Sequence, residues 1–142
     1  MLEAVNIAKG TFEVKLAPQS SDDPAARHEE GAPLGRMSID KQFHGGIEGT
    51  SKGEMLTAGW PAKGSAGYVA VERVTGTLDG KRGSFALMHT GTMSKGTQQL
   101  TIVVVPDSGT GELSGLDGKF TIKIADGKHF YEFEYTIAVT KN

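Results

Sequence analysis

The chain has 142 residues, of which 37% are hydrophobic, with 15 basic and 17 acidic side chains and no cysteine. This length suits one domain covering residues 1–142, which can bury roughly two thirds of its unfolded surface. The missing cysteines exclude disulfides and thiolate chemistry, and the balanced, scattered charges argue against a nucleic-acid partner. Because no run of about eighteen apolar residues and no secretory pattern occurs, we expect a cytoplasmic protein with no membrane partner.

Alternation of apolar and polar residues predicts β-strands along almost the whole chain. The first strand is expected at 11–16, and the segment from Gln19 to Pro33, rich in Ser, Asp, Glu and Pro, predicts a flexible loop and a candidate lid. Further strands are predicted at about 34–44, 47–58, 66–78, 82–91, 97–105, 119–124 and 131–139. The Asp-Gly pairs at 79–80, 117–118 and 126–127 predict hairpin turns.

Eight short-linked strands with one apolar face predict an all-β, eight-stranded antiparallel closed barrel. An open sheet would leave its apolar face wet and both edges unpaired, whereas closure covers the face and removes the edges. A two-sheet β-sandwich satisfies the same pattern and remains the alternative.

Three local motifs invite a chemical interpretation and are set aside on context. Gly49-Thr50-Ser51-Lys52-Gly53 matches G-x-S-x-G, but an extended segment follows it where a hydrolase needs a helix. The segment 106–115 lacks the Gly-Lys-Ser/Thr ending of a phosphate-binding loop. The four histidines show no metal-binding spacing. We therefore predict no cofactor and no metal site, and assign no catalytic residue.

The hairpin around Asp79-Gly80 carries the more informative signal. If these residues form a two-residue turn, Leu78 pairs with Lys81 and Glu72 pairs with Leu87. That register places one set of side chains on a single face: Tyr68, Glu72, Val74, Phe85, Leu87 and His89. Glu72 and His89 then sit diagonally within reach of each other, whereas a one-residue slip would turn Arg73 inward instead.

Other polar residues also interrupt apolar faces, namely Lys41 among its hydrophobic neighbours, and Tyr131 and Tyr135 in the last strand. The candidate ligand-binding residues of the lumen are therefore Lys41, Tyr68, Glu72, Phe85, Leu87, His89, Tyr131 and Tyr135. The ionisable members either orient a ligand or move a proton in a dry pocket, or they form a satisfied internal salt bridge.

The sequence resembles a bacterial family catalogued as a domain of unknown function and related to allene oxide cyclase-like barrels. The residues that carry the resemblance are Gly10-Thr11-Phe12-Glu13-Val14, Phe43, Gly45, Glu48-Gly49-Thr50-Ser51, Gly53-Glu54-Met55-Leu56, Glu72-Arg73-Val74, Gly76-Thr77-Leu78, Gly80, Gly83-Ser84-Phe85, Leu87, His89, Gly91-Thr92, Val105-Pro106, Ser108-Gly109-Thr110-Gly111-Glu112-Leu113 and Gly115-Leu116. The resemblance implies a closed antiparallel barrel of calycin-like shape and no established activity. The chemistry of the plant cyclases is an analogy of fold only.

Three functions fit these observations. The first is a binding module that holds a small hydrophobic or amphipathic molecule in its lumen, with Lys41, Glu72 or His89 meeting its polar end. The second is an isomerase or cyclase of a hydrophobic substrate that uses Glu72 or His89 as acid or base. The third is a homo-oligomer whose barrel core is filled. The interior cavity is the feature that separates them.

Overall fold

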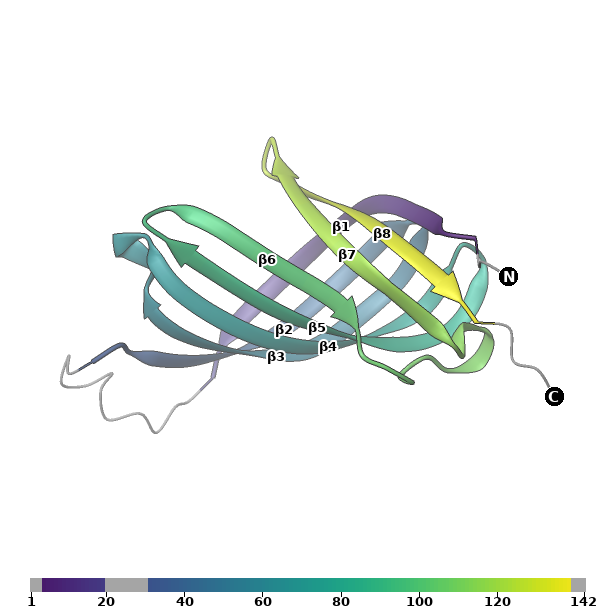
Figure 1. The fold of residues 1–142 in the computed structure, drawn as a ribbon, viewed down its shortest axis with the longest axis horizontal. Helices are drawn as coiled ribbons and strands as arrows, with labels where there is room; N and C mark the ends of the chain where they lie inside the picture. Colours follow the sequence, from purple (N-terminus) through teal and green to yellow (C-terminus); the bar gives the residue numbers. More distant parts are fainter. Residues whose placement is uncertain (1–3, 20–30, 139–142) are drawn as a thin grey trace.

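The computed structural model describes residues 4–19 and 31–138, which form a closed antiparallel barrel (Figure 1). Its strands are β1 (Asn6–Pro18), β2 (Leu34–Gly45), β3 (Ile47–Trp60), β4 (Ser65–Leu78), β5 (Lys81–Ser94), β6 (Thr97–Val104), β7 (Leu116–Ala125) and β8 (Lys128–Ile137). Each strand pairs with the next and β8 pairs with β1, which confirms the predicted barrel and excludes the sandwich. The predicted loop between Gln19 and Pro33 falls mainly on residues 20–30, which lie outside the described residues.

Two-residue turns set the register of the barrel. Asp79 and Asp126 have positive φ angles of 48° and 52° and each precedes a glycine, as the predicted hairpins require. A third turn of this kind, at Lys95 with φ 50°, was not predicted. The turn predicted at Asp117-Gly118 is wrong, because both residues lie inside β7. There the glycine permits close strand approach, since a Cβ at Gly118 would come within 2.4 Å of the Glu134 carbonyl oxygen.

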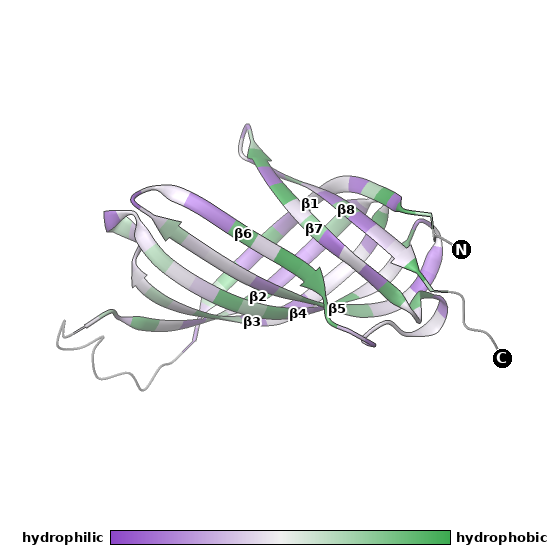
Figure 2. Ribbon diagram, in the orientation of Figure 1, coloured by the Kyte–Doolittle hydropathy of each residue, from purple (hydrophilic) through white to green (hydrophobic). Residues whose placement is uncertain are grey.

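One end of the barrel is filled with apolar side chains. This closed end is formed by the turns after β2 and β4 and by the 3-10 turn η2 (Gly111–Leu113). Inward-facing Phe85 and Phe133 stack there with ring centroids 5.6 Å apart, and Leu78 and Leu113 are fully buried beside them. Along β7, Figure 2 shows the alternation of hydrophobic and hydrophilic residues that a strand with one inward face requires.

Two tyrosines of β8 tie the closed end together. The Tyr131 hydroxyl donates to the His44 carbonyl oxygen at 2.9 Å and accepts from the Ile47 backbone N–H at 2.8 Å. The Tyr135 hydroxyl donates to the Asp79 carboxylate in the turn after β4. These bonds fasten the last strand to two hairpins and close this end of the barrel.

The opposite end, with the turns after β3, β5 and β7, is not filled in the same way. Leu16, Leu100 and Ile124 occupy inward-facing positions of β1, β6 and β7, yet they are 42%, 44% and 67% exposed. β6 and β7 pair at two positions, Ile102 with Phe120 and Val103 with Lys119, and then diverge toward this open end (Figure 1). The barrel therefore changes along its axis from a packed core to an open half.

Candidate functional site

A buried polar layer lies where the packed core stops. It consists of Lys41, Ser51, Glu72 and His89, one residue each from β2, β3, β4 and β5. The register brings them together. Lys41 pairs directly with Ser51 across β2 and β3. On β4, Ser51 pairs with Val74 and His89 pairs with Ala70, so Glu72, midway between these two positions, is diagonal to both. All four side chains point inward by the same alternation that buries the core.

Glu72 is the centre of this polar layer and its side chain is fully buried. Its Oε2 atom accepts hydrogen bonds from Lys41 Nζ at 2.8 Å and from His89 Nε2 at 2.6 Å, and its Oε1 atom accepts from Ser51 Oγ at 2.8 Å. Burial alone would raise the pKa of Glu72, but the His89 hydrogen bond and the Lys41 ammonium outweigh it and lower the pKa to about 2. Glu72 is therefore ionised at neutral pH.

The ammonium group of Lys41 is enclosed as well. Its side chain is 6% exposed, and Nζ lies 4.9 Å from the Phe12 ring centroid and 5.8 Å from that of Phe43. Ring faces stabilise a cation in addition to the carboxylate. Among the described residues, every buried side-chain nitrogen and oxygen has a hydrogen-bond partner. The polar layer is thus an internally satisfied ion pair, as one of the two sequence interpretations proposed.

Tyr68 connects this polar layer to the open half of the barrel. Its hydroxyl lies 3.4 Å from His89 Nδ1, which is long for such a bond. Burial, with the negative charge of Glu72 adding to it, raises the pKa of Tyr68. The Tyr68 ring lies across β5 at Gly91, where a Cβ would come within 2.3 Å of the ring. Glycine at this position is what allows the tyrosine to reach over the strand.

A cavity of about 360 Å³ lies beyond Tyr68 at the open end. Its walls come from β3 to β6 and include Met55, Thr57, Tyr68, Gly91, Met93 and Leu100. The lining is mainly apolar, its polar residues are Thr57, Tyr68, Thr92, Gln98 and Gln99, and it contains no Asp, Glu, Lys or Arg. Apolar walls with a few placed polar groups are typical of small-molecule sites.

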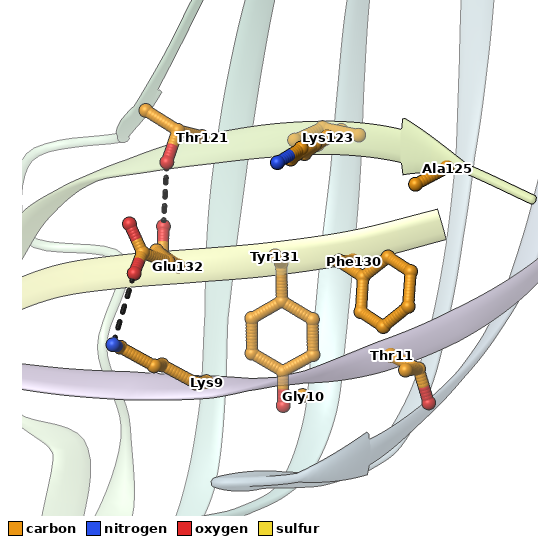
Figure 3. A pocket seen from close by; sticks show the side chains of 10 residues that line it. Lys9, Gly10, Thr11, Thr121, Lys123, Ala125, Phe130, Tyr131 and Glu132 are labelled. Carbon is orange, nitrogen blue, oxygen red and sulfur yellow. Dashed lines mark hydrogen bonds and ion pairs between the residues drawn. The ribbon is translucent and has the colours of Figure 1, made fainter. Parts of the chain in front are cut away.

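A larger hollow of about 850 Å³ lies over β1, β7 and β8, and its lining shares no residue with the polar layer (Figure 3). Exposed side chains form much of its wall, including the ion pair of Lys9 with Glu132 at 3.1 Å. Tyr131 is the buried residue of its lining, and the Tyr131 hydroxyl is already bonded at the closed end. We therefore do not place the functional site in this hollow.

The structure brings part of the predicted site together. The hairpin register is confirmed, and Glu72 contacts His89 as expected. Lys41 and Tyr68 join them, whereas the other candidates lie in the packed core or at the closed end and do not line the 360 Å³ cavity: Phe85, Leu87, Tyr131 and Tyr135. A ligand-binding role for any of these residues stays a prediction.

Sequence reasoning missed Ser51 and most of the cavity wall. Ser51 lies in the G-x-S-x-G match whose extended context argues against a nucleophile, yet it is buried and donates to Glu72. The sequence does contain a signal for Ser51. Strand alternation counted from the apolar residue Ile47 places Ser51 and Met55 on the same inward face as Ile47. Met93 and Leu100 also face the cavity, but only the shape of the barrel shows that the space beside them is unfilled.

Within residues 4–19 and 31–138, no cluster of three or more His, Cys, Asp or Glu side chains could hold a metal ion. The same part of the chain contains no helix long and apolar enough to cross a membrane. At the site itself, Glu72, His89 and Tyr68 can supply hydrogen bonding and proton transfer.

The fold and the site together define a small closed β-barrel with a buried Lys-Glu-His layer beneath an apolar cavity. The profile of the DUF3224 family, described as a protein of unknown function, matches residues 8–135, so the chain belongs to this family. It is similar to a crystal structure of a DUF3224 protein of unknown function from Shewanella oneidensis, with 46% identity and a TM-score of 0.87. The match covers 96% of this chain and 100% of that one. A search of curated proteins finds no match. Kinship with allene oxide cyclase-like barrels stays a prediction.

Proposed function

We propose that the protein binds a small apolar or amphipathic molecule in the cavity at the open end of the barrel. The observation that supports this most strongly is the cavity of about 360 Å³ between apolar walls, next to a buried polar layer. Its volume lies at the lower end of the roughly 300–1,000 Å³ usual for small-molecule sites. Inward-facing leucine and methionine side chains there have hydrocarbon surface left to bury against a guest.

Binding of the neutral dye Nile red tests the proposal, because its emission shifts to the blue in an apolar site. Met93 lines the cavity, whereas Met88 lies on the outer face of the same strand and is 43% exposed. We expect M93W, which fills the cavity, to weaken dye binding at least tenfold, and M88W to leave it unchanged. Absence of dye binding by the wild type, or equal binding by M93W, would contradict the proposal.

A second candidate function is acid–base catalysis, such as isomerisation or cyclisation of a hydrophobic substrate. The observation that favours it is the 2.6 Å contact of Glu72 Oε2 with His89 Nε2 beside the cavity. A carboxylate so placed holds the imidazole ring in a fixed orientation, with Nδ1 toward Tyr68. Benzisoxazole is a suitable probe, because one proton transfer from its C3 atom to a base breaks the N–O bond and releases a phenolate. Turnover above buffer that is lost in H89Q would support this function, and equal rates in H89Q would remove His89 from it.

Homo-oligomerisation stays a prediction. Exposed apolar side chains adjoin on the outer faces of β3, β4 and β5, where Leu56 pairs with Val69 and Val71 pairs with Met88. Exposed apolar patches of this kind often mark contacts between proteins. Light scattering of the purified protein would give its oligomeric state.

A further inference from the structure

We infer that the ligand presents an uncharged hydrogen-bond donor, such as a hydroxyl group, to Tyr68 and His89, and not a carboxylate or an ammonium. The inference rests on the proposed binding function and names the class of ligand that this site accepts. It follows from which charges and hydrogen bonds the buried polar layer has already used.

The charges of the polar layer are paired with each other. The Lys41 ammonium is bound to Glu72 at 2.8 Å and covered by the Phe12 ring, so it offers no free positive charge to an anionic ligand. None of the described residues that line the cavity is Asp, Glu, Lys or Arg. A charged head group would therefore lose its hydration without gaining a counter-charge, which is costly in an apolar site.

The hydrogen bonds of Glu72 also decide what His89 can offer. A carboxylate accepts hydrogen bonds, so the 2.6 Å contact assigns a proton to His89 Nε2. In the neutral imidazole the other nitrogen, Nδ1, then carries a lone pair and acts as an acceptor. Nδ1 is the nitrogen that faces Tyr68. The polar layer thus turns an acceptor toward the open half of the barrel.

Tyr68 leaves this acceptor partly free. The distance of 3.4 Å between its hydroxyl and Nδ1 exceeds that of a strong hydrogen bond. Tyr68 also lines the cavity and is half-buried. A ligand hydroxyl beside the phenol can donate to Nδ1 while it accepts from the Tyr68 hydroxyl, which satisfies all three groups. An ether oxygen has no proton to donate to Nδ1. A carboxylate also has none, so its oxygen lone pairs would face the Nδ1 lone pair and repel it.

Calorimetric titration with four eight-carbon compounds tests this inference at mildly alkaline pH. They are octanol, octyl methyl ether, octanoate and octylammonium, and they share the same apolar chain. We expect octanol to bind at least tenfold more tightly than either charged compound and several-fold more tightly than the ether. Y68F should weaken octanol binding by about fivefold to tenfold, as for one neutral hydrogen bond, and weaken ether binding by no more than this, because an ether oxygen can accept from Tyr68 but cannot donate to Nδ1. Thr90 is exposed on the outer face of β5, so T90V is the matched control and should change nothing.

The outcomes separate the inference from the function on which it rests. Octanoate or octylammonium binding as tightly as octanol would overturn the inference, and so would an equal loss for all four compounds in Y68F. If Nile red binds but none of the four compounds displaces it, the inference also fails while the binding function stands. If the wild type binds neither the dye nor any of the four, the binding function itself fails.

Discussion

The two ends of the barrel follow the same pattern of alternating residues but are packed differently. Leu78 at the closed end and Leu100 at the open end both face inward, yet Leu78 is 0% exposed and Leu100 is 44% exposed. At the closed end, aromatic rings and η2 fill the space, whereas at the open end β6 diverges from β7. Alternation therefore determines which way a side chain points, and the shape of the barrel determines whether it is buried.

The buried polar layer marks the boundary between these two regions. A charged group is tolerated there because Glu72 receives three donors and Lys41 receives a carboxylate and two ring faces. The closed end supplies stability through packing, and the open end supplies a cavity. The predictions below test this division of the molecule.

The largest contrast is expected between two equivalent truncations. Leu78→Ala removes a fully buried side chain from the packed core and should cost about 4 kcal/mol of the free energy of unfolding. Leu100→Ala removes a half-exposed side chain and should cost less than about 1 kcal/mol. Urea denaturation of both variants measures the difference. Equal losses would mean that the open end is packed as well as the closed end.

Removing the charge at the centre of the polar layer should have nearly as large an effect. Glu72→Gln leaves Lys41 buried without a counter-charge and should cost about 3–4 kcal/mol. Adding Lys41→Met should restore part of this loss, because no unpaired charge then remains. Glu134→Gln on the exposed face of β8 is the control and should cost less than about 0.5 kcal/mol. Denaturation showing Glu72→Gln as stable as the wild type would refute the ion-pair account.

Lowering the pH should reduce the free energy of unfolding by protonating Glu72. Because the folded-state pKa of Glu72 is lowered from 4.5 to about 2, its contribution is present above pH 4.5 and is lost as the pH falls to about 2. The loss should be about 3 kcal/mol. It is measured as the difference in unfolding free energy between the wild type and Glu72→Gln across this pH range. A difference that does not shrink with falling pH would contradict the assignment.

The smallest contrast concerns two tyrosine hydroxyls. Tyr135→Phe removes the bond to Asp79 at the closed end and should cost about 1 kcal/mol. Tyr68→Phe removes only a long contact at the open end and should cost less than about 0.5 kcal/mol. Thermal unfolding of the two variants compares them. A larger loss for Tyr68→Phe would show that the hydroxyl near the cavity serves stability more than binding.

The fold was predictable from sequence because strand alternation and turn chemistry agree over most of the chain. The Asp79-Gly80 turn alone set the register that pairs Glu72 with Leu87 and brings His89 to Glu72. The same dipeptide at Asp117-Gly118 misled, because its glycine serves the close approach of β7 to β8. A dipeptide does not reveal which neighbour a glycine must accommodate.

The cavity was less predictable than the fold. Sequence reasoning identified polar residues on inward faces, but it could not tell that Tyr135 ties a turn at the closed end while Tyr68 borders a space. Nor did it pair Lys41 with Glu72, which lie on strands separated by β3. These facts depend on how the strands coil and diverge around the barrel, which no local pattern records.

Methyl resonances of methionine offer the most direct test of the open half as a binding site. The chain has five methionines, of which Met55 and Met93 line the cavity and Met88 lies on the outer face. When protein labelled at the methionine methyl groups is titrated with Nile red, ring currents of the dye should shift the resonances of Met55 and Met93 and leave that of Met88 in place. Shifts confined to Met88, or none at saturating dye, would contradict the account.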